Sequence, residues 1–157
     1  MNRLQKLVAL ALVGGALAVA GCGGGDDGPS ADDASADYRS IDQSIQSFGT
    51  ELAQALTAAS TSTDAQLGQQ FDAFSDKSNT LLTDVKNLDV PDDLKSDRDA
   101  LVAALDDGVE DIEDIAAAVS SKDADAARTA ATKLVRDSAA IRDARAQFKD
   151  ALAQATK

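Results

Sequence analysis

Over most of the chain, apolar residues recur at intervals of three and four, with polar residues between them. This is the spacing of one face of an α-helix, and it is repeated in four successive stretches. The pattern predicts four helices, at about 36–60, 64–88, 91–121 and 123–155. The four stripes are Tyr38, Ile41, Ile45, Phe48, Leu52, Leu56 and Ala59; Leu67, Phe71, Phe74, Ser78, Leu81, Val85 and Leu88; Leu94, Arg98, Leu101, Leu105, Gly108, Ile112, Ile115 and Val119; and Ala127, Ala131, Leu134, Ser138, Ile141, Arg145, Phe148 and Leu152.

The breaks between the stripes carry residues that start helices. Thr63 and Gln66 have the spacing of a capping box, Pro91 suits a first helical position, and Asp123 suits an N-cap. Short connections make neighbouring helices antiparallel. We therefore expect residues 35–157 to form an all-α, up-down-up-down antiparallel four-helix bundle.

Aligning the stripes in alternating directions gives a packing register. It sets Phe74 opposite Gly108 and Phe48 level with Ser78, so that large side chains meet small ones. Such matching layers favour a monomer. The alternative is a pair of long helical hairpins that associate between chains.

The N-terminus has the build of a secretory signal. Arg3 and Lys6 form a short positive region, and the chain from Leu7 to Ala20 then carries no charge. This run is shorter than the roughly 20 residues that a membrane-spanning helix needs. It ends in Val19-Ala20-Gly21-Cys22, which contains the one cysteine of the chain.

This tetrapeptide resembles the lipobox of bacterial membrane lipoproteins. The resemblance implies that 1–21 is a signal peptide cleaved between Gly21 and Cys22, and that Cys22 carries a diacylglyceryl lipid. The protein would then be anchored on the extracytoplasmic face of the cell membrane, with residues 22–34, rich in Gly and Asp, as a flexible tether. The alternative is cleavage at an ordinary A-x-A site, Ala18-Val19-Ala20, which would release a soluble protein with an unpaired cysteine.

The composition and net charge of the chain argue against several classes of function. The net charge of −12 disfavours binding to nucleic acid or to an anionic membrane surface. The chain has no histidine, and its one methionine is Met1, so the usual ligand sets for haem, di-iron centres and zinc cannot be assembled. Histidine-based nucleophilic catalysis lacks its base. We expect no enzyme activity, no catalytic residue, no metal site and no cofactor beyond the lipid.

Two arginines, Arg98 and Arg145, interrupt otherwise apolar stripes. The antiparallel layering places them in adjacent layers near Tyr38. One interpretation is a small anion-binding pocket, because guanidinium groups bind carboxylate and phosphate. The other is that their stems lie along the core and their heads reach nearby carboxylates. The candidate partners are Asp42, Asp84, Asp97 and Asp99.

The densest charge run is DDGVEDIEDI, residues 106–115. It lacks the loop pattern of an EF-hand, and its acidic residues are expected on the outer, solvated face of the third helix.

Two hypotheses for function remain. The first is a membrane-anchored, non-enzymatic interaction or adaptor module for an envelope protein or basic ligand. The second is a carrier that binds a small apolar or anionic ligand between helices, near Arg98 and Arg145.

Overall fold

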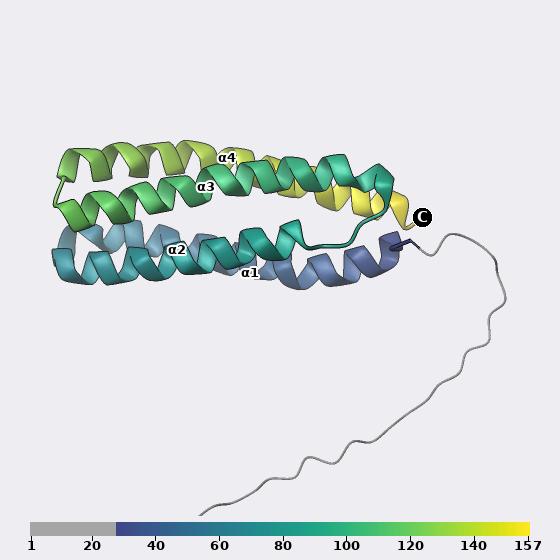
Figure 1. Cartoon of the computed structure of the whole chain (residues 1–157), viewed down its shortest axis with the longest axis horizontal. Helices are drawn as coiled ribbons and strands as arrows, with labels where there is room; N and C mark the ends of the chain where they lie inside the picture. The colour runs from purple at the N-terminus through teal and green to yellow at the C-terminus, as the bar shows by residue number, and fades with distance from the viewer. Residues whose placement is uncertain (1–27) are drawn as a thin grey trace, which may run out of the picture.

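Four long helices make up almost all of the computed structural model, which describes residues 28–157 (Figure 1). They are α1 (Ala31–Ala58), α2 (Asp64–Lys86), α3 (Lys95–Ser121) and α4 (Ala124–Ala155), with short 3-10 helices η1 (Ala59–Thr61) and η2 (Asp92–Leu94) between them. The described residues contain no strand. The predicted all-α fold is confirmed. The signal peptide and Cys22 lie outside the described residues.

Consecutive helices run in opposite directions, and each packs against two neighbours, in the cyclic order α1, α2, α3, α4 and back to α1. The start of α1, the α2–α3 connection and the C-terminus lie at one end of the bundle (Figure 1). The α1–α2 and α3–α4 connections lie at the other. Any tether on α1 therefore leaves from the same end as the C-terminus.

The first helix begins at Ala31, earlier than the predicted position 36. Its N-cap is Ser30, whose hydroxyl accepts a hydrogen bond from the backbone N–H of Asp33 at 3.1 Å. Ala34 is buried in the core. Residues 31–34, assigned above to the flexible tether, therefore belong to the bundle, because a capping side chain and one buried methyl group hold them in the helix.

Two of the three predicted helix starts are confirmed. Thr63 and Gln66 form the capping box, and Asp123 caps α4 through the N–H groups of Asp125 and Ala126. The prediction for Pro91 is wrong: its ψ of 155° is extended, and α3 begins only at Lys95.

The connection between α2 and α3 follows an irregular path because its apolar residues are buried. Leu88, Val90 and Leu94 are all buried there, so this segment crosses the end of the bundle and covers the core. A helix starting at Pro91 would give up that cover.

The predicted register is also corrected at Gly108. No atom of Phe74 lies within 4 Å of a Cβ built at Gly108; the side chain in contact there is Ile141 of α4, whose Cδ1 would lie 2.9 Å away. The missing side chain thus lets α3 and α4 approach closely. Helix α1 contacts its two neighbours less extensively than α3 contacts α2 and α4.

Candidate functional site

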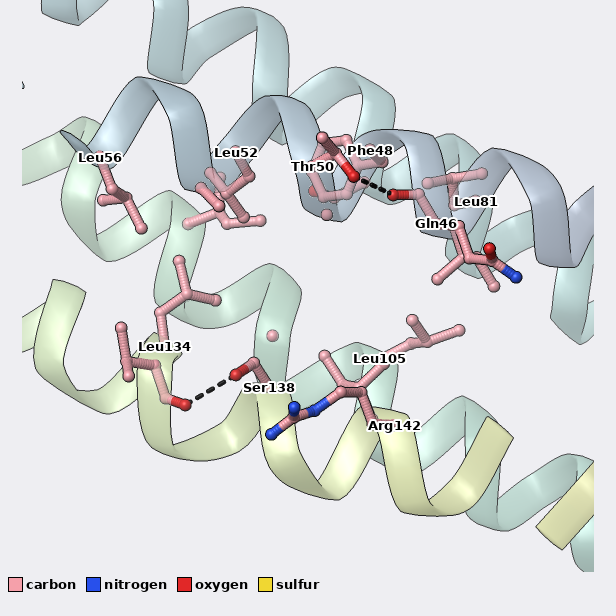
Figure 2. A pocket seen from close by; sticks show the side chains of 18 of the residues that line it. Gln46, Phe48, Thr50, Leu52, Leu56, Leu81, Leu105, Leu134, Ser138 and Arg142 are labelled. Carbon is pink, nitrogen blue, oxygen red and sulfur yellow. Dashed lines mark hydrogen bonds between the residues drawn. The ribbon is translucent and has the colours of Figure 1, made fainter. Parts of the chain in front are cut away.

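A groove runs along the seam between α1 and α4. The two helices are in contact where the rings of Tyr38 and Phe148 meet edge to face, with centroids 4.7 Å apart. Beyond this contact lies a space of about 1030 Å³, which we call the α1–α4 groove (Figure 2). Its walls come from residues 45–58 of α1 and 134–145 of α4, and its floor comes from α3 and α2.

Apolar side chains form most of the groove. Leu52 and Leu56 of α1 face Leu134 of α4 across it (Figure 2). The floor residues are Ser78, Leu81, Leu105, Gly108, Val109 and Ile112. On the α4 wall, Val135 is 64% exposed, and among the described residues it is the one large hydrophobic side chain on the surface. Its side chain extends the apolar lining of the groove to the surface of α4.

The hydroxyl groups around the groove are already satisfied by their own helices. Thr50 donates to the carbonyl of Gln46 at 3.0 Å, and Ser138 donates to that of Val135 at 2.7 Å (Figure 2). Ser78 does the same to its own helix. These groups therefore do not need hydrogen bonds from a ligand, and the groove offers an apolar surface.

The charges in the lining are all positive. Arg142 and Arg145 line the groove and no Asp or Glu does, although the chain has 27 acidic residues against 15 Lys and Arg. Among the described residues, Arg142 makes no ion pair. The groove thus contrasts with the acidic exterior.

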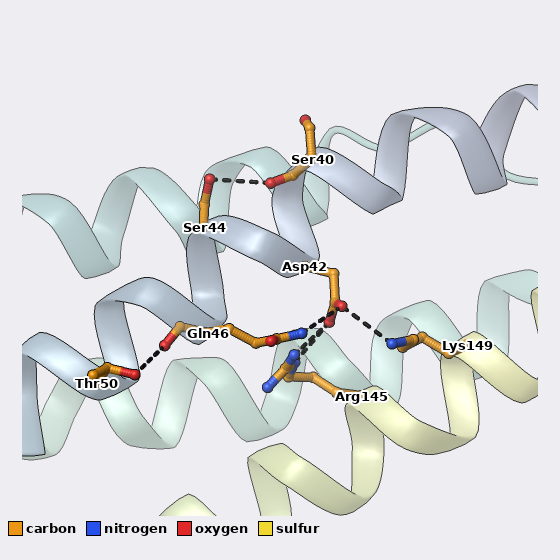
Figure 3. A network of polar contacts seen from close by, with 7 residues as sticks. All are labelled: Ser40, Asp42, Ser44, Gln46, Thr50, Arg145 and Lys149. Atoms are coloured by element: carbon orange, nitrogen blue, oxygen red, sulfur yellow. Dashed lines mark hydrogen bonds and ion pairs between the residues drawn. The ribbon is translucent and has the colours of Figure 1, made fainter.

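One end of the groove is closed by a cluster of polar side chains around Asp42, a residue that is only 6% exposed (Figure 3). Arg145 donates to its Oδ1 from Nε at 3.0 Å and from Nη2 at 2.5 Å. Lys149 and Gln46 donate to Oδ2 at 3.2 and 3.0 Å. We call these four residues the Asp42 cluster. It ties the N-terminal half of α1 to the C-terminal half of α4.

The pKa values in the cluster follow from these contacts. Burial alone would raise the pKa of Asp42, but the hydrogen bonds and charges of Arg145 and Lys149 outweigh it, and the pKa is lowered. Burial, with the nearby charge of Asp42, raises the pKa of Tyr38 to about 12, against the opposing effect of Arg145. Asp42 is thus ionised and Tyr38 neutral at pH 7.

The two arginines named from the sequence do not share a site. Arg145 pairs with Asp42, whereas Arg98 donates to Asp99 at 2.8 and 3.1 Å and to the carbonyl of Leu88 at 3.3 Å. The two carboxylates, Asp42 and Asp99, were both among the partners expected from the sequence. Arg145 lines the groove and Arg98 does not. The anion-binding pocket expected from Arg98 and Arg145 together is therefore wrong.

The acidic run 106–115 also differs from the expectation. Asp111 does not lie on the solvated face: it is 0% exposed, between α3 and α4, with Lys133 Nζ 2.7 Å from its Oδ1. Burial raises the pKa of Asp111, Lys133 opposes this rise and Asp137 adds to it. The close approach of α4 to α3 at Gly108, one turn away, explains why this flank is covered.

Other residues of the same run bind α2. Glu113 accepts a hydrogen bond from Asn79 at 3.0 Å, and Asp106 pairs with Lys86 at 3.4 Å. The run therefore joins helices as well as facing solvent. Within residues 28–157, no group of three or more His, Cys, Asp or Glu side chains is placed to hold a metal ion.

No helix in the described part of the chain is long and apolar enough to cross a bilayer. Comparison with protein-family models, with curated proteins and with solved structures gives no match. The function is therefore argued from the groove itself.

Of the residues that line the groove, sequence reasoning named only Arg145 as a candidate site residue, so it missed Gly49 and Arg142 among others. Arg142 directly follows the seam residue Ile141 and so lies beside the apolar stripe rather than in it. Gly49 lines the α1 wall, and a Cβ built there would meet no atom within 4 Å. A signal was present: the flank of the first stripe carries Gly49, Ala53 and Thr57, small residues at helical spacing.

Proposed function

We propose that this protein is a membrane-anchored, non-enzymatic envelope lipoprotein whose helical bundle carries an apolar small molecule in the α1–α4 groove. The observation that supports the carrier role is the groove: its volume of about 1030 Å³ is slightly above the roughly 300–1,000 Å³ typical of ligand sites. Its lining is largely apolar, with few polar groups seeking partners.

The groove changes the order of the two hypotheses drawn from the sequence. An adaptor for an envelope protein rests on the acidic exterior, which many soluble proteins share. A carrier rests on a defined concave site. The carrier is therefore the better-supported function, although its site uses Arg145 and Arg142 rather than Arg145 and Arg98.

The anchoring part of the proposal rests on Val19-Ala20-Gly21-Cys22. A lipid on Cys22 would keep the bundle close to the bilayer, where apolar molecules concentrate, and so raise their effective concentration at the groove. Intact mass spectrometry of the wild type and of Cys22→Ala, with membrane fractionation, tests it. An acylated mass beginning at Cys22, lost in the variant, supports anchoring; an unacylated wild-type protein in the soluble fraction overturns it.

The carrier role is tested by photo-crosslinking the full chain in its native membranes. The probe is a neutral long-chain alcohol with a diazirine on its alkyl chain, and the labelled peptides are mapped by mass spectrometry. We expect labelling on the walls of the groove, around Leu52, Leu56 and Leu134. The Gly49→Leu variant places a branched side chain on the α1 wall, which narrows the groove and is expected to reduce this labelling, whereas Gly49→Ala adds one methyl group and keeps it.

Both variants replace a glycine inside a helix, so each is expected to be at least as stable as the wild type. For Gly49→Ala, the free energy of unfolding should rise by about 0.5–1 kcal/mol. Reduced labelling in Gly49→Leu with an unchanged or higher melting temperature thus reports on the groove and not on unfolding. Labelling that is spread over all four helices, or that Gly49→Leu does not reduce, would refute the carrier role.

A further inference from the structure

The shape of the groove selects an extended ligand. Residues 45–58 of α1 span about 20 Å at the rise of an α-helix. One acyl chain of a membrane lipid spans about half of a hydrocarbon core that is roughly 30 Å thick. A single alkyl chain therefore fits along the groove.

The groove also has a direction. At one end the Asp42 cluster closes it, and Arg142 and Arg145 lie on that side. At the other end the lining is Leu56, Ala58, Leu134 and Val135, without any charge. A ligand with one charged end thus has only one favourable orientation.

At the polar end of the groove, Arg142 is the cation that can pair with a ligand. Arg145 already donates twice to Asp42, but Arg142 has no ion pair among the described residues and extends along the α4 wall beside Ser138 (Figure 2). Its helical neighbours three and four residues away are Ser138, Ala139, Arg145 and Ala146, none of them acidic. The adjacent Asp143 makes no ion pair with it among the described residues, unlike the neighbouring pairs Arg98–Asp99 and Arg136–Asp137. A monoanion would balance this charge. A phosphate dianion would need a second free cation in the lining, and the other lining cation, Arg145, is paired with Asp42.

We infer that the α1–α4 groove binds a long-chain carboxylate. Its carboxylate pairs with Arg142, and its alkyl chain runs past Leu52 and Leu134 toward Leu56 and Ala58. Arg142 fixes the head group because guanidinium binds carboxylate through two parallel hydrogen bonds. This inference rests on the proposed carrier function and names its ligand class.

The test compares two diazirine probes with the same alkyl chain, one ending in a carboxylate and one in an alcohol, on the full chain in native membranes. In the wild type we expect the carboxylate probe to label the groove at about tenfold lower concentration than the alcohol, the effect of one partly exposed charge-assisted contact. Arg142→Gln should abolish that preference and leave labelling by the alcohol unchanged.

Arg39→Gln is the matched control. Arg39 is also exposed and makes no ion pair among residues 28–157, but it does not line the groove. It should keep the tenfold preference. Unlabelled palmitate should compete with the carboxylate probe better than a monoacyl phosphate of equal chain length.

The outcomes separate the two proposals. Equal labelling by both probes, unaffected by Arg142→Gln, overturns the carboxylate assignment and leaves the carrier function standing. Stronger competition by the monoacyl phosphate also overturns it, in favour of a phosphorylated head group. Failure of both probes to label the groove overturns both proposals.

Discussion

The carboxylate of Asp42 in α1 accepts hydrogen bonds from the guanidinium of Arg145 in α4, across 103 residues of sequence. Lys149 and Gln46 complete the set of donors. Two carboxylates are buried in the described part of the chain, and Asp42 is the one that connects the first helix to the last. Its contribution to stability can be measured directly.

We expect Asp42→Asn to lower the free energy of unfolding by about 3 kcal/mol, because the poorly exposed guanidinium of Arg145 loses its counter-charge. Urea unfolding followed by far-UV circular dichroism measures the change. Asp37→Asn, on an exposed position of the same helix, is the control and should change little. Lys149→Ala should cost below about 1 kcal/mol, since that side chain is half exposed. Equal losses for Asp42→Asn and Asp37→Asn would contradict this account.

Asp111 is predicted to respond to pH in the opposite direction from Asp42. The pKa of Asp42 is lowered in the folded state, so its contribution to stability is present above the unfolded pKa of about 3.9 and is lost as the pH falls through the folded value. Burial, together with Asp137 and against Lys133, raises the pKa of Asp111, so its contribution is present at low pH and is lost as the pH rises through the folded value.

Asp111→Asn should therefore be neutral or stabilising at neutral pH, by about 1 kcal/mol. Relative to the wild type, its melting temperature should rise as the pH increases from the unfolded pKa of about 3.9 through the raised pKa of folded Asp111. Asp107→Asn, exposed on the same helix, serves as the control without this pH dependence. A variant that is less stable than the wild type at neutral pH would mean that the ion pair with Lys133 outweighs the cost of burying Asp111.

The close contact between Gly108 and Ile141 predicts a coupled pair of substitutions. Gly108→Ala should gain less than the usual 0.5–1 kcal/mol for alanine in a helix, since the new methyl group would lie about 2.9 Å from Ile141 Cδ1. Ile141→Val removes that carbon, so Gly108→Ala should show its full gain in the Ile141→Val background. A double-mutant cycle measures the coupling, and strictly additive effects would contradict the packing described here.

Lys122 ends α3 in the left-handed region, with φ 57° and ψ 32°. A residue with a Cβ is strained there by roughly 1 kcal/mol, and glycine is not. Lys122→Gly should raise the free energy of unfolding by about that amount. Lys122→Ala removes the same charge but keeps the Cβ, so it should not stabilise the protein. Thermal unfolding of the two variants distinguishes the backbone effect from the loss of charge.

The helical spacing of apolar residues was sufficient to predict four helices and their antiparallel order, because each stripe must be buried against another. The start of α1 was missed because Ala31 to Ala34 have the composition of the tether. The signal for it was Ser30, since serine is a common N-cap residue. Asp111 was misplaced because its burial depends on how closely α4 approaches α3. Periodicity along one helix contains no information on that distance.

A ligand site between helices was hypothesised near Arg98 and Arg145, and only Arg145 lines the groove. Its position depends on where α1 and α4 separate, which follows from the Asp42 cluster at one end and from small side chains along α1. Arg145 was singled out because it interrupts a stripe. Arg142 gave no such signal, since its position beside the stripe is where a solvated charge is expected.

The contact between α1 and α4 has a consequence for the order in which the bundle assembles and loosens. Adjacent helices meet after closing short loops, but the α1–α4 seam closes a loop of about a hundred residues, the most costly in chain entropy. We expect this seam to form last during folding and to open first in the folded protein. In hydrogen exchange, the amides of α1 should therefore exchange before those of α3, and a ligand could enter the groove while the other three helices stay packed.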